Sequence, residues 1–233
     1  MSLHAGRIER LGDEARRRIA GTGEDAEGHA VRARRILRLL FDEVGFAGNR
    51  ADYYDPRNSF LNEVLDRRLG IPISLAVILI EVARHAGVQA DGVGFPGHFL
   101  VRFGPGELER AAPVSAPTPS ASAPRAISPP LPILIDPFGG RLLDASSLRA
   151  LNAQVTGSDT IPDPRLLQPS GSRQILTRML GNLRAIFRSR GDERSLRLVL
   201  ERLAVLTPGD EEVVAALTAL AGPPPPPPMP LKN

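Results

Sequence analysis

The stretch that decides the fold is Gly70–Phe103, which reads GIPISLAVILIEVARHAGVQADGVGFPGHFLVRF. Pro72 suits the first turn of a helix, because the backbone N–H that proline lacks would have no partner there. The residues that follow, about Ile73–Ala86, are apolar nearly all round, which predicts a buried helix that Gly87 ends. His98–Phe103 then alternates between polar and apolar residues as a strand does. We therefore expect a buried helix followed by a strand.

The segments on either side extend this pattern. Ser59–Arg68 has apolar and polar residues on opposite faces, which predicts an amphipathic helix before the buried one. After the strand, residues 104–132 are rich in Pro, Ser and Ala and have no apolar period, so we expect a disordered insert. Ile133–Ile135 predicts a second strand, which Asp136 follows, and Arg141–Leu143 predicts a short third one. These strands predict a small antiparallel sheet.

Both ends of the chain are expected to be helical. Residues 1–50 hold a short amphipathic helix and a second helix from about Ala26 to Val44. Residues 172–222 have the apolar spacing of three helices separated by tight breaks. Residues 223–233 begin with the run Pro223–Pro228, which is compatible only with polyproline II or disorder. The expected organisation is N-terminal helices over 1–50, a core over 51–145, helices over 172–222 and a proline tail.

Composition excludes several kinds of site. The 233 residues include no cysteine, so disulfides, cysteine-ligated zinc, iron–sulfur clusters and a cysteine nucleophile are ruled out. The four histidines are scattered and form no HExxH motif, so we expect no metal and no cofactor. Leu75–Ile80, the longest apolar run, is far too short to span a bilayer, and we expect a cytoplasmic protein.

The positive charge is almost all arginine. The formal net charge is only +3, and Lys232 is the only lysine. The N-terminal arginines alternate with acids or apolar residues on expected helix faces, which is typical of solvated helices. Nucleic-acid binding needs the charge gathered on one face, so it is not favoured here.

Several motifs together resemble one known family. They are Asn58–Asn62 (NSFLN), Val64–Asp66 (VLD), Gly70–Ser74 (GIPIS), Pro96–Arg102 (PGHFLVR) and Ile135–Pro137 (IDP). The sequence resembles the SirB-type regulator family of bacteria over roughly residues 30–145, and its helical end from Ser172 fits the same family. The same core resembles a domain of some eukaryotic F-box proteins. The resemblance implies an α+β fold, with a transglutaminase-like (papain-type) core, N-terminal helices, a small antiparallel sheet and a tetratricopeptide-like C-terminal helical tail.

The resemblance also suggests where a catalytic triad would lie. In the superfamily the nucleophilic cysteine precedes a helical alanine by four positions, and Ala76 is the matching alanine. The nucleophile position therefore holds Pro72. His98 falls on the catalytic histidine and Asp136 on the catalytic aspartate. Two of the three positions are retained without the group they would activate.

The retained residues leave alternatives open. Ser74 could replace the nucleophile, but two residues rotate a side chain by about 200° around a helix, which would turn it away from His98. Its simpler role is to satisfy N–H groups in the first helical turn. His98 and Asp136 could act as a general base on bound water or substrate. Alternatively, the pair holds strands together or contacts a ligand.

Further polar residues are candidates for lining a cleft. Asn58, Asn62 and Asp66 lie in the motifs that carry the resemblance, and the last two share a helix face at i, i+4. They could line a cleft beside His98, form a solvated face, or cap the turn at Gly70. Arg102 alternates with His98 along the strand and could bind an anionic group or pair with an acid.

We therefore expect a non-catalytic regulatory or protein-interaction module, whose partner is another protein or peptide bound in the cleft or on the helical tail. The alternative is a cysteine-free hydrolase or acyl-transfer enzyme that uses His98 and Asp136. A nucleic-acid-associated protein is a third and weaker interpretation.

Overall fold

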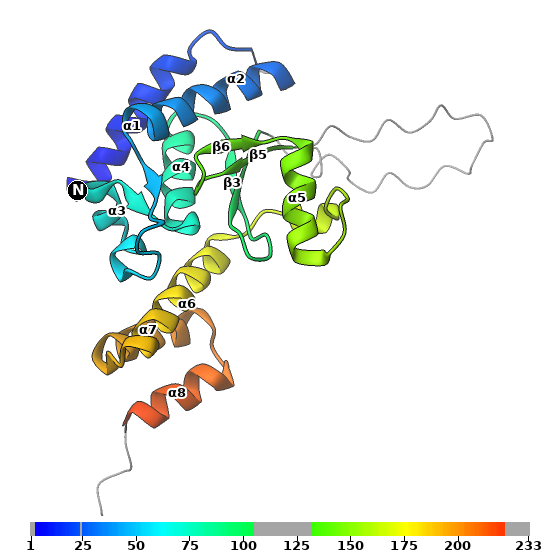
Figure 1. Ribbon diagram of the computed structural model, residues 1–233. Coiled ribbons are helices and arrows are strands. Elements are labelled where there is room, and N and C mark those ends of the chain that lie inside the picture. The colour runs from blue at the N-terminus through cyan, green and yellow to red at the C-terminus, as the bar shows by residue number, and fades with distance from the viewer. Residues whose placement is uncertain (1–2, 24, 105–131, 222–233) are drawn as a thin grey trace, which may run out of the picture. The chain divides into compact units, whose positions relative to one another are not determined.

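The computed structural model describes residues 3–23, 25–104 and 132–221 (Figure 1). The chain forms two compact units. The first unit contains the chain up to Tyr53 and Arg57–Gly171, and the second contains Tyr54–Pro56 and the chain from Ser172 onward. The N-terminal helices thus belong to the same unit as the expected core, and this unit continues beyond the expected boundary at residue 145.

The N-terminal helices are α1 (Leu3–Ile19) and α2 (Ala26–Leu37). Asp25 caps α2, since its carboxylate accepts the backbone N–H of Gly28 at 2.8 Å. The sequence predicted a single helix to about Val44, and this prediction was wrong in its last turns. The chain changes at residue 38 into the π-helix η1 (Arg38–Glu43), where the Val44 N–H bonds the Leu39 carbonyl at 2.9 Å, five residues back.

The two central helices lie where the sequence predicted them. The 3₁₀-helix η2 (Pro56–Asn58) leads into α3 (Leu61–Arg67), and α4 (Pro72–His85) begins at the predicted proline. The short strands β1 (Ala47–Gly48) and β2 (Leu69–Gly70) pair in parallel and tie the loop before α3 to the segment before α4. Most α4 residues are buried and only Arg84 is exposed, as expected for a helix that is apolar nearly all round.

The sheet is small and antiparallel, with the order β3-β4-β5-β6. Its strands are β3 (Ala90–Val93), β4 (Leu100–Phe103), β5 (Ile133–Asp136) and β6 (Arg141–Leu143). The strand predicted from His98 begins two residues later. His98 instead lies in a turn, where its backbone N–H bonds the Phe95 carbonyl at 3.0 Å. This correction moves the histidine from the strand to its entrance.

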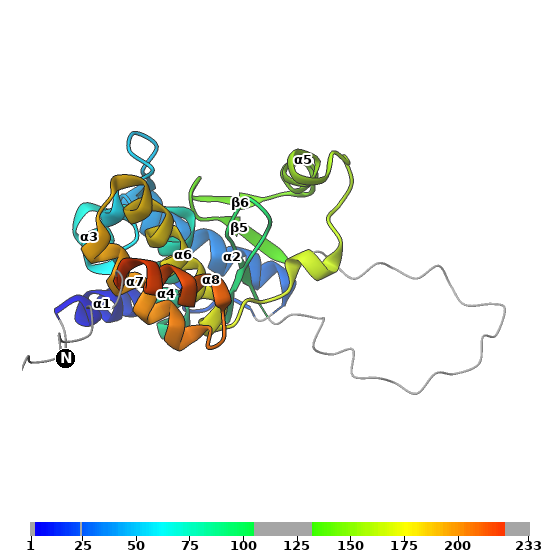
Figure 2. The same cartoon turned by 90° about the horizontal axis from the view of Figure 1, so that it is seen from below.

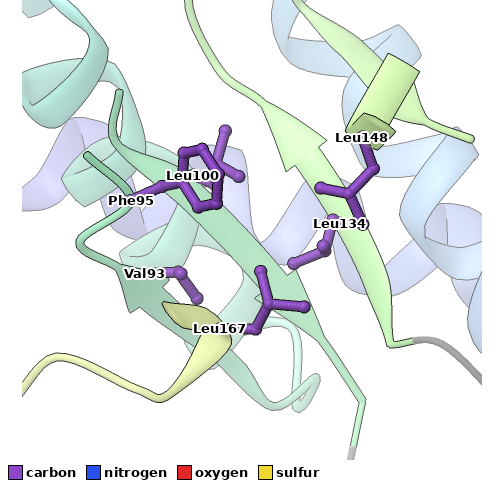
Figure 3. Close-up of a cluster of buried hydrophobic side chains, with 6 residues drawn as sticks. All are labelled: Val93, Phe95, Leu100, Leu134, Leu148 and Leu167. Atoms are coloured by element: carbon purple, nitrogen blue, oxygen red, sulfur yellow. The ribbon is translucent and has the colours of Figure 1, made fainter. Parts of the chain in front are cut away.

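Helices cover both faces of the sheet. α4 packs against β3 and β4, while α5 (Ala145–Thr156) lies on the opposite face (Figures 1 and 2). Figure 3 shows the apolar cluster on the α5 side, to which the 3₁₀-helix η4 (Pro164–Leu167) also contributes. Its buried members are Val93, Phe95, Leu100, Leu134, Leu148 and Leu167. Neither α5 nor η4 was predicted from the sequence.

The N-terminal cap of α5 is strongly hydrogen-bonded. The Asp144 carboxylate accepts the backbone N–H of Ser147 and the hydroxyl of Ser146, both at 2.8 Å. The bond from the Ser147 backbone N–H is the largest cause that lowers the pKa of Asp144 to about 2. An aspartate at the N-cap position is a start signal for a helix, and it is the one signal that this segment carries in the sequence.

The second unit contains α6 (Ser172–Arg190), α7 (Glu193–Leu206) and α8 (Glu211–Ala221), which confirms the three helices expected from residue 172. Their own apolar core consists of Leu183, Phe187, Val199, Leu200, Leu203 and Val213. No helix in the described ranges is long and apolar enough to cross a bilayer. The expected disordered insert, apart from its two end residues, and the proline tail lie outside the described residues.

Candidate functional site

The start of α4 holds Pro72, the residue that the resemblance aligns with the nucleophile. Pro72 is the first residue of the helix and is partly exposed, after the extended N-cap residue Ile71. Free N–H groups at a helix start favour an anionic group there. Proline supplies neither a nucleophile nor a titratable group, so residue 72 itself provides no catalytic group.

Ser74 is fully buried and works as part of the helix start. Its Oγ accepts the backbone N–H of Ile71 at 3.1 Å and lies 2.6 Å from the Asn58 carbonyl, to which it donates. The hydroxyl proton is therefore engaged, and the oxygen is closed off from solvent. This confirms the predicted role in the first helical turn and does not support a nucleophilic role.

Asn58 is also fully buried, although the sequence predicted it in a cleft. Its Nδ2 donates to the carbonyls of Asp52 at 2.7 Å and Tyr53 at 3.2 Å. Its Oδ1 accepts from Nδ2 of Asn49, which is itself buried, at 3.0 Å. We call Asn49, Asn58 and Ser74 the buried polar network. It fixes the loop before α3 onto α4, and its amide groups face the protein's own backbone.

Asn62 and Asp66 are both exposed on α3. Asp66 forms an ion pair with Arg7 of α1, and Arg7 also donates to the Leu65 carbonyl at 2.7 Å. The carboxylate therefore links α3 to α1. Asn62 lies on the solvent side, and a role for it in binding a partner stays a prediction.

His98 and Asp136 lie at neighbouring strand ends, as the resemblance implied. The register of β4 and β5 pairs Val101 with Ile135, which places Asp136 opposite Leu100, two residues beyond His98. The His98 side chain is half-buried, and its ring centroid lies 6.4 Å from that of Phe95. The two strands thus bring the predicted base and its predicted orienting acid to the same end of the sheet.

The Asp136 carboxylate already has several partners. Its Oδ1 accepts the backbone N–H groups of Phe138 at 3.0 Å and Gly139 at 3.1 Å, and its Oδ2 lies 3.7 Å from Nε of Arg141. A Cβ on Gly139 would lie only 2.6 Å from Oδ2, so the tight turn requires glycine. These partners compete with an imidazole for the carboxylate, and the orienting role stays a prediction.

Arg102 is buried in the centre of the sheet, with only 2% of its surface exposed. It lies opposite Asp91 of β3, and its Nη2 is 3.5 Å from the Asp91 carboxylate. Its Nε and Nη1 have no hydrogen-bond partner among the described residues. Of the two predicted roles, the structure supports the pairing with an acid, although the pair is long and incomplete.

An aromatic contact that the sequence did not indicate joins the loop after β1 to the turn after β5. The Phe138 ring packs against Gly48, where a Cβ would lie 2.4 Å from the ring. The Tyr53 ring meets Phe138 edge-on, with centroids 5.9 Å apart, and the Arg50 guanidinium lies 4.9 Å above the Phe138 ring. A glycine at residue 48 was the available signal, because glycine permits such close approach.

Comparison with known proteins identifies the family. The chain matches the family described as the transglutaminase-like superfamily over residues 4–181. The chain belongs to this superfamily. The match includes α1 and α2 as well as the sheet, in agreement with a first unit that contains both.

Individual relatives support the same assignment. A UPF0162 protein of Xylella fastidiosa (strain 9a5c) is 41% identical over 184 residues, which are 77% of this chain and 57% of that protein. The UPF0162 protein of Pseudomonas aeruginosa is 29% identical over 88% of this chain and 67% of its own length. Human F-box only protein 21 is 32% identical over 71% of this chain but only 23% of its own length.

This transglutaminase-like chain spans a little over half the length of the Xylella relatives. No solved structure matches it significantly. The fold and the superfamily are therefore established, whereas the activity and the partners are not.

Proposed function

We propose that this transglutaminase-like chain is a non-catalytic regulatory module that binds another protein or peptide. The single observation that carries the proposal is Pro72 at the first position of α4, where the superfamily places its cysteine, in a chain without any cysteine. The hydroxyl of Ser74, two residues further along α4, is buried and hydrogen-bonded. Loss of the nucleophile leaves at best the residual catalysis that binding and electrostatics supply.

Two further features are consistent with an interaction module. The match to human F-box only protein 21 covers 23% of that protein, so a related core occurs as one part of a larger chain. We assign the present chain to the SirB-type branch and interpret α6–α8 as tetratricopeptide-like helices. Under this interpretation the partner binds either at the core beside His98 or on the helices α6–α8. Val205, which is 78% exposed on α7, belongs to the helical surface.

A cysteine-free hydrolase or acyl-transfer enzyme is the second candidate. It is favoured by the position of His98 and Asp136 at the same end of adjacent strands. In this reaction His98 would remove a proton from a bound water or from a substrate hydroxyl or amine, and Asp136 would orient its ring. The reaction would need neither Pro72 nor Ser74.

An activity screen separates the two candidates. Hydrolysis and amine transfer on glutamine peptides and esters are measured for the wild-type chain, His98→Ala and the control His85→Ala. His85 is a matched control because it lies at the end of α4, 3.2 Å from Asp13. We expect no detectable hydrolysis or amine transfer from any of the three folded proteins. Activity that His98→Ala abolishes and His85→Ala retains would establish the enzyme and overturn the non-catalytic proposal.

The binding surface is located with single cysteines, since the chain has no thiol of its own. A thiol-linked photocrosslinker at Asn62→Cys reports on the core, and one at Val205→Cys reports on the helices. Arg84→Cys, on the exposed side of α4, serves as the control. We expect a captured partner to crosslink at one of the first two positions and not at the third. Equal crosslinking at all three would contradict a defined surface.

A further inference from the structure

A pocket lies on a part of the first unit that the proposed function does not use. It has a volume of about 260 Å³ and is lined by Arg18, Arg35, Arg38 and Glu43. These residues come from α1, α2 and η1, of which α1 and α2 pack against each other (Figure 1). Three guanidinium groups face one carboxylate, so the wall of the pocket is positively charged.

Two of the arginines are held in place by the protein itself. Nε of Arg18 lies 2.7 Å from Glu14 and its Nη1 lies 2.6 Å from Glu43. The hydrogen bonds to Glu43 and Glu14 raise the pKa of Arg18. Nη1 of Arg35 donates to the Arg18 carbonyl at 2.6 Å. The guanidinium groups therefore need little reordering before they meet a ligand, which lowers the entropic cost of binding.

Among the described residues, these contacts leave several N–H donors without a partner. They are Nη2 of Arg18, Nε and Nη2 of Arg35, and both terminal nitrogens of Arg38. Arg38 is three-quarters exposed, and its contact is with Glu43 at 3.5 Å. The carboxylate oxygens of Glu43 are each beside an arginine, Oε2 beside Arg18 and Oε1 beside Arg38. Its negative charge is therefore largely neutralised toward the pocket.

The backbone provides an independent observation. Arg38 and Glu43 are the first and last residues of the π-helix η1, and the buried Leu39 and Leu40 anchor the turn between them. A π-helix is rare and is frequently found at functional sites. Here the irregular turn contributes two of the four residues that line the pocket.

We propose that this pocket binds a small ligand through a phosphate-type oxyanion, either inorganic phosphate or the phosphoryl group of a small molecule. Guanidinium groups form bidentate hydrogen bonds to phosphate oxygens, and three arginines line this pocket. The pocket is shallow and open to solvent, and it has room for a phosphate with a small substituent. Glu14 and Glu43 interrupt the positive charge, which disfavours the continuous basic track that a nucleic-acid backbone needs.

The test is calorimetric titration of the full chain with inorganic phosphate and pyrophosphate at low salt. We expect Arg38→Gln to weaken binding roughly tenfold, because it removes charge-assisted hydrogen bonds. Arg38→Lys keeps the positive charge but cannot form the bidentate hydrogen bonds of a guanidinium, so it should weaken phosphate binding by an intermediate factor. Arg84→Gln is the control. It removes the same charge at another place, on α4, where Arg84 pairs with Glu81.

Three outcomes would overturn the proposal. They are no binding of either anion at millimolar concentration, equal binding by wild type and Arg38→Gln, or an equal loss in Arg84→Gln. A single-stranded RNA oligonucleotide is titrated in parallel. The small-ligand proposal fails if the RNA binds far more tightly than pyrophosphate and if its steep salt dependence is reduced by Arg38→Gln. In that case the site binds the phosphate backbone of a nucleic acid.

Discussion

Replacing Ser74 with alanine removes one oxygen from the buried polar network and leaves its partners unpaired. The Ile71 N–H and the Asn58 carbonyl both belong to residues that are at most 2% exposed, so water cannot replace the hydroxyl. An unsatisfied buried donor or acceptor costs about 1–3 kcal/mol. We therefore expect Ser74→Ala to lower the free energy of unfolding of the first unit by about 2–4 kcal/mol.

Urea denaturation followed by circular dichroism measures this change, and the m-value must stay constant for the comparison to hold. For a protein of this size the expected fall in Tm is roughly 5–15 °C. Ser146→Ala is the control, because its hydroxyl bonds the Asp144 carboxylate at the exposed start of α5 and should change stability by less than about 0.5 kcal/mol. If Ser74→Ala were as mild as Ser146→Ala, the hydroxyl would not hold the loop to α4, and our account of its burial would be refuted.

Three further predictions follow from the same structure. Pro72→Cys introduces the only thiol of the chain at a helix N-terminus, so its pKa should fall below the usual value of about 8.5, as measured by the pH dependence of its reaction with a disulfide reagent. A thiol pKa that is higher in Pro72→Cys/His98→Ala than in Pro72→Cys would place His98 beside the thiol. A thiol pKa near the usual value in both proteins would show that position 72 lacks the electrostatics of a nucleophile site. The backbone N–H of Ser147 lowers the folded-state pKa of Asp144 to about 2, so this carboxylate stabilises the fold above its unfolded pKa and the contribution is lost as pH falls toward 2. Asp144→Asn should flatten the dependence of Tm on pH in that window, and an unchanged acid profile would contradict the cap. Arg102→Met removes a buried cation with two unpaired nitrogens among the described residues, and the carboxylate of Asp91, which is 29% exposed, can then be hydrated. Stability should therefore be unchanged or raised by about 1 kcal/mol, and a large loss in urea denaturation would show that the ion pair with Asp91 stabilises the sheet.

The elements that the sequence predicted best are those whose patterns are uniform. The continuous apolar face of Ile73–Ala86 has no stable alternative to a buried helix, and Pro72 fixes its start. The π-helix Arg38–Glu43 could not be predicted, because its residues keep a helical apolar spacing and differ only in which carbonyl accepts each N–H. The helix from Ala145 carried a cap signal in Asp144, but too few apolar residues follow for the period to be recognised.

Only part of the candidate site could be predicted from the sequence. The nearness of His98 and Asp136 came from the resemblance and is consistent with the pairing of β4 and β5. The burial of Asn58 was not predictable, because an asparagine in a Pro- and Asp-rich loop is normally solvated. Only the folded loop shows that the carbonyls of Asp52 and Tyr53 turn inward to meet it.

The buried polar network has a consequence for how the molecule opens. A surface loop usually unfolds locally at little cost, and its amide protons exchange quickly with water. The loop through Asp52 instead ends on Asn58, whose buried side chain bonds the loop's own backbone and whose backbone carbonyl accepts the hydroxyl of Ser74 on α4. The side-chain amide of Asn58 and the backbone N–H of Ile71 should therefore exchange at the rate of global unfolding of the first unit. By this measure a segment without regular secondary structure belongs to the slowest-opening part of the fold.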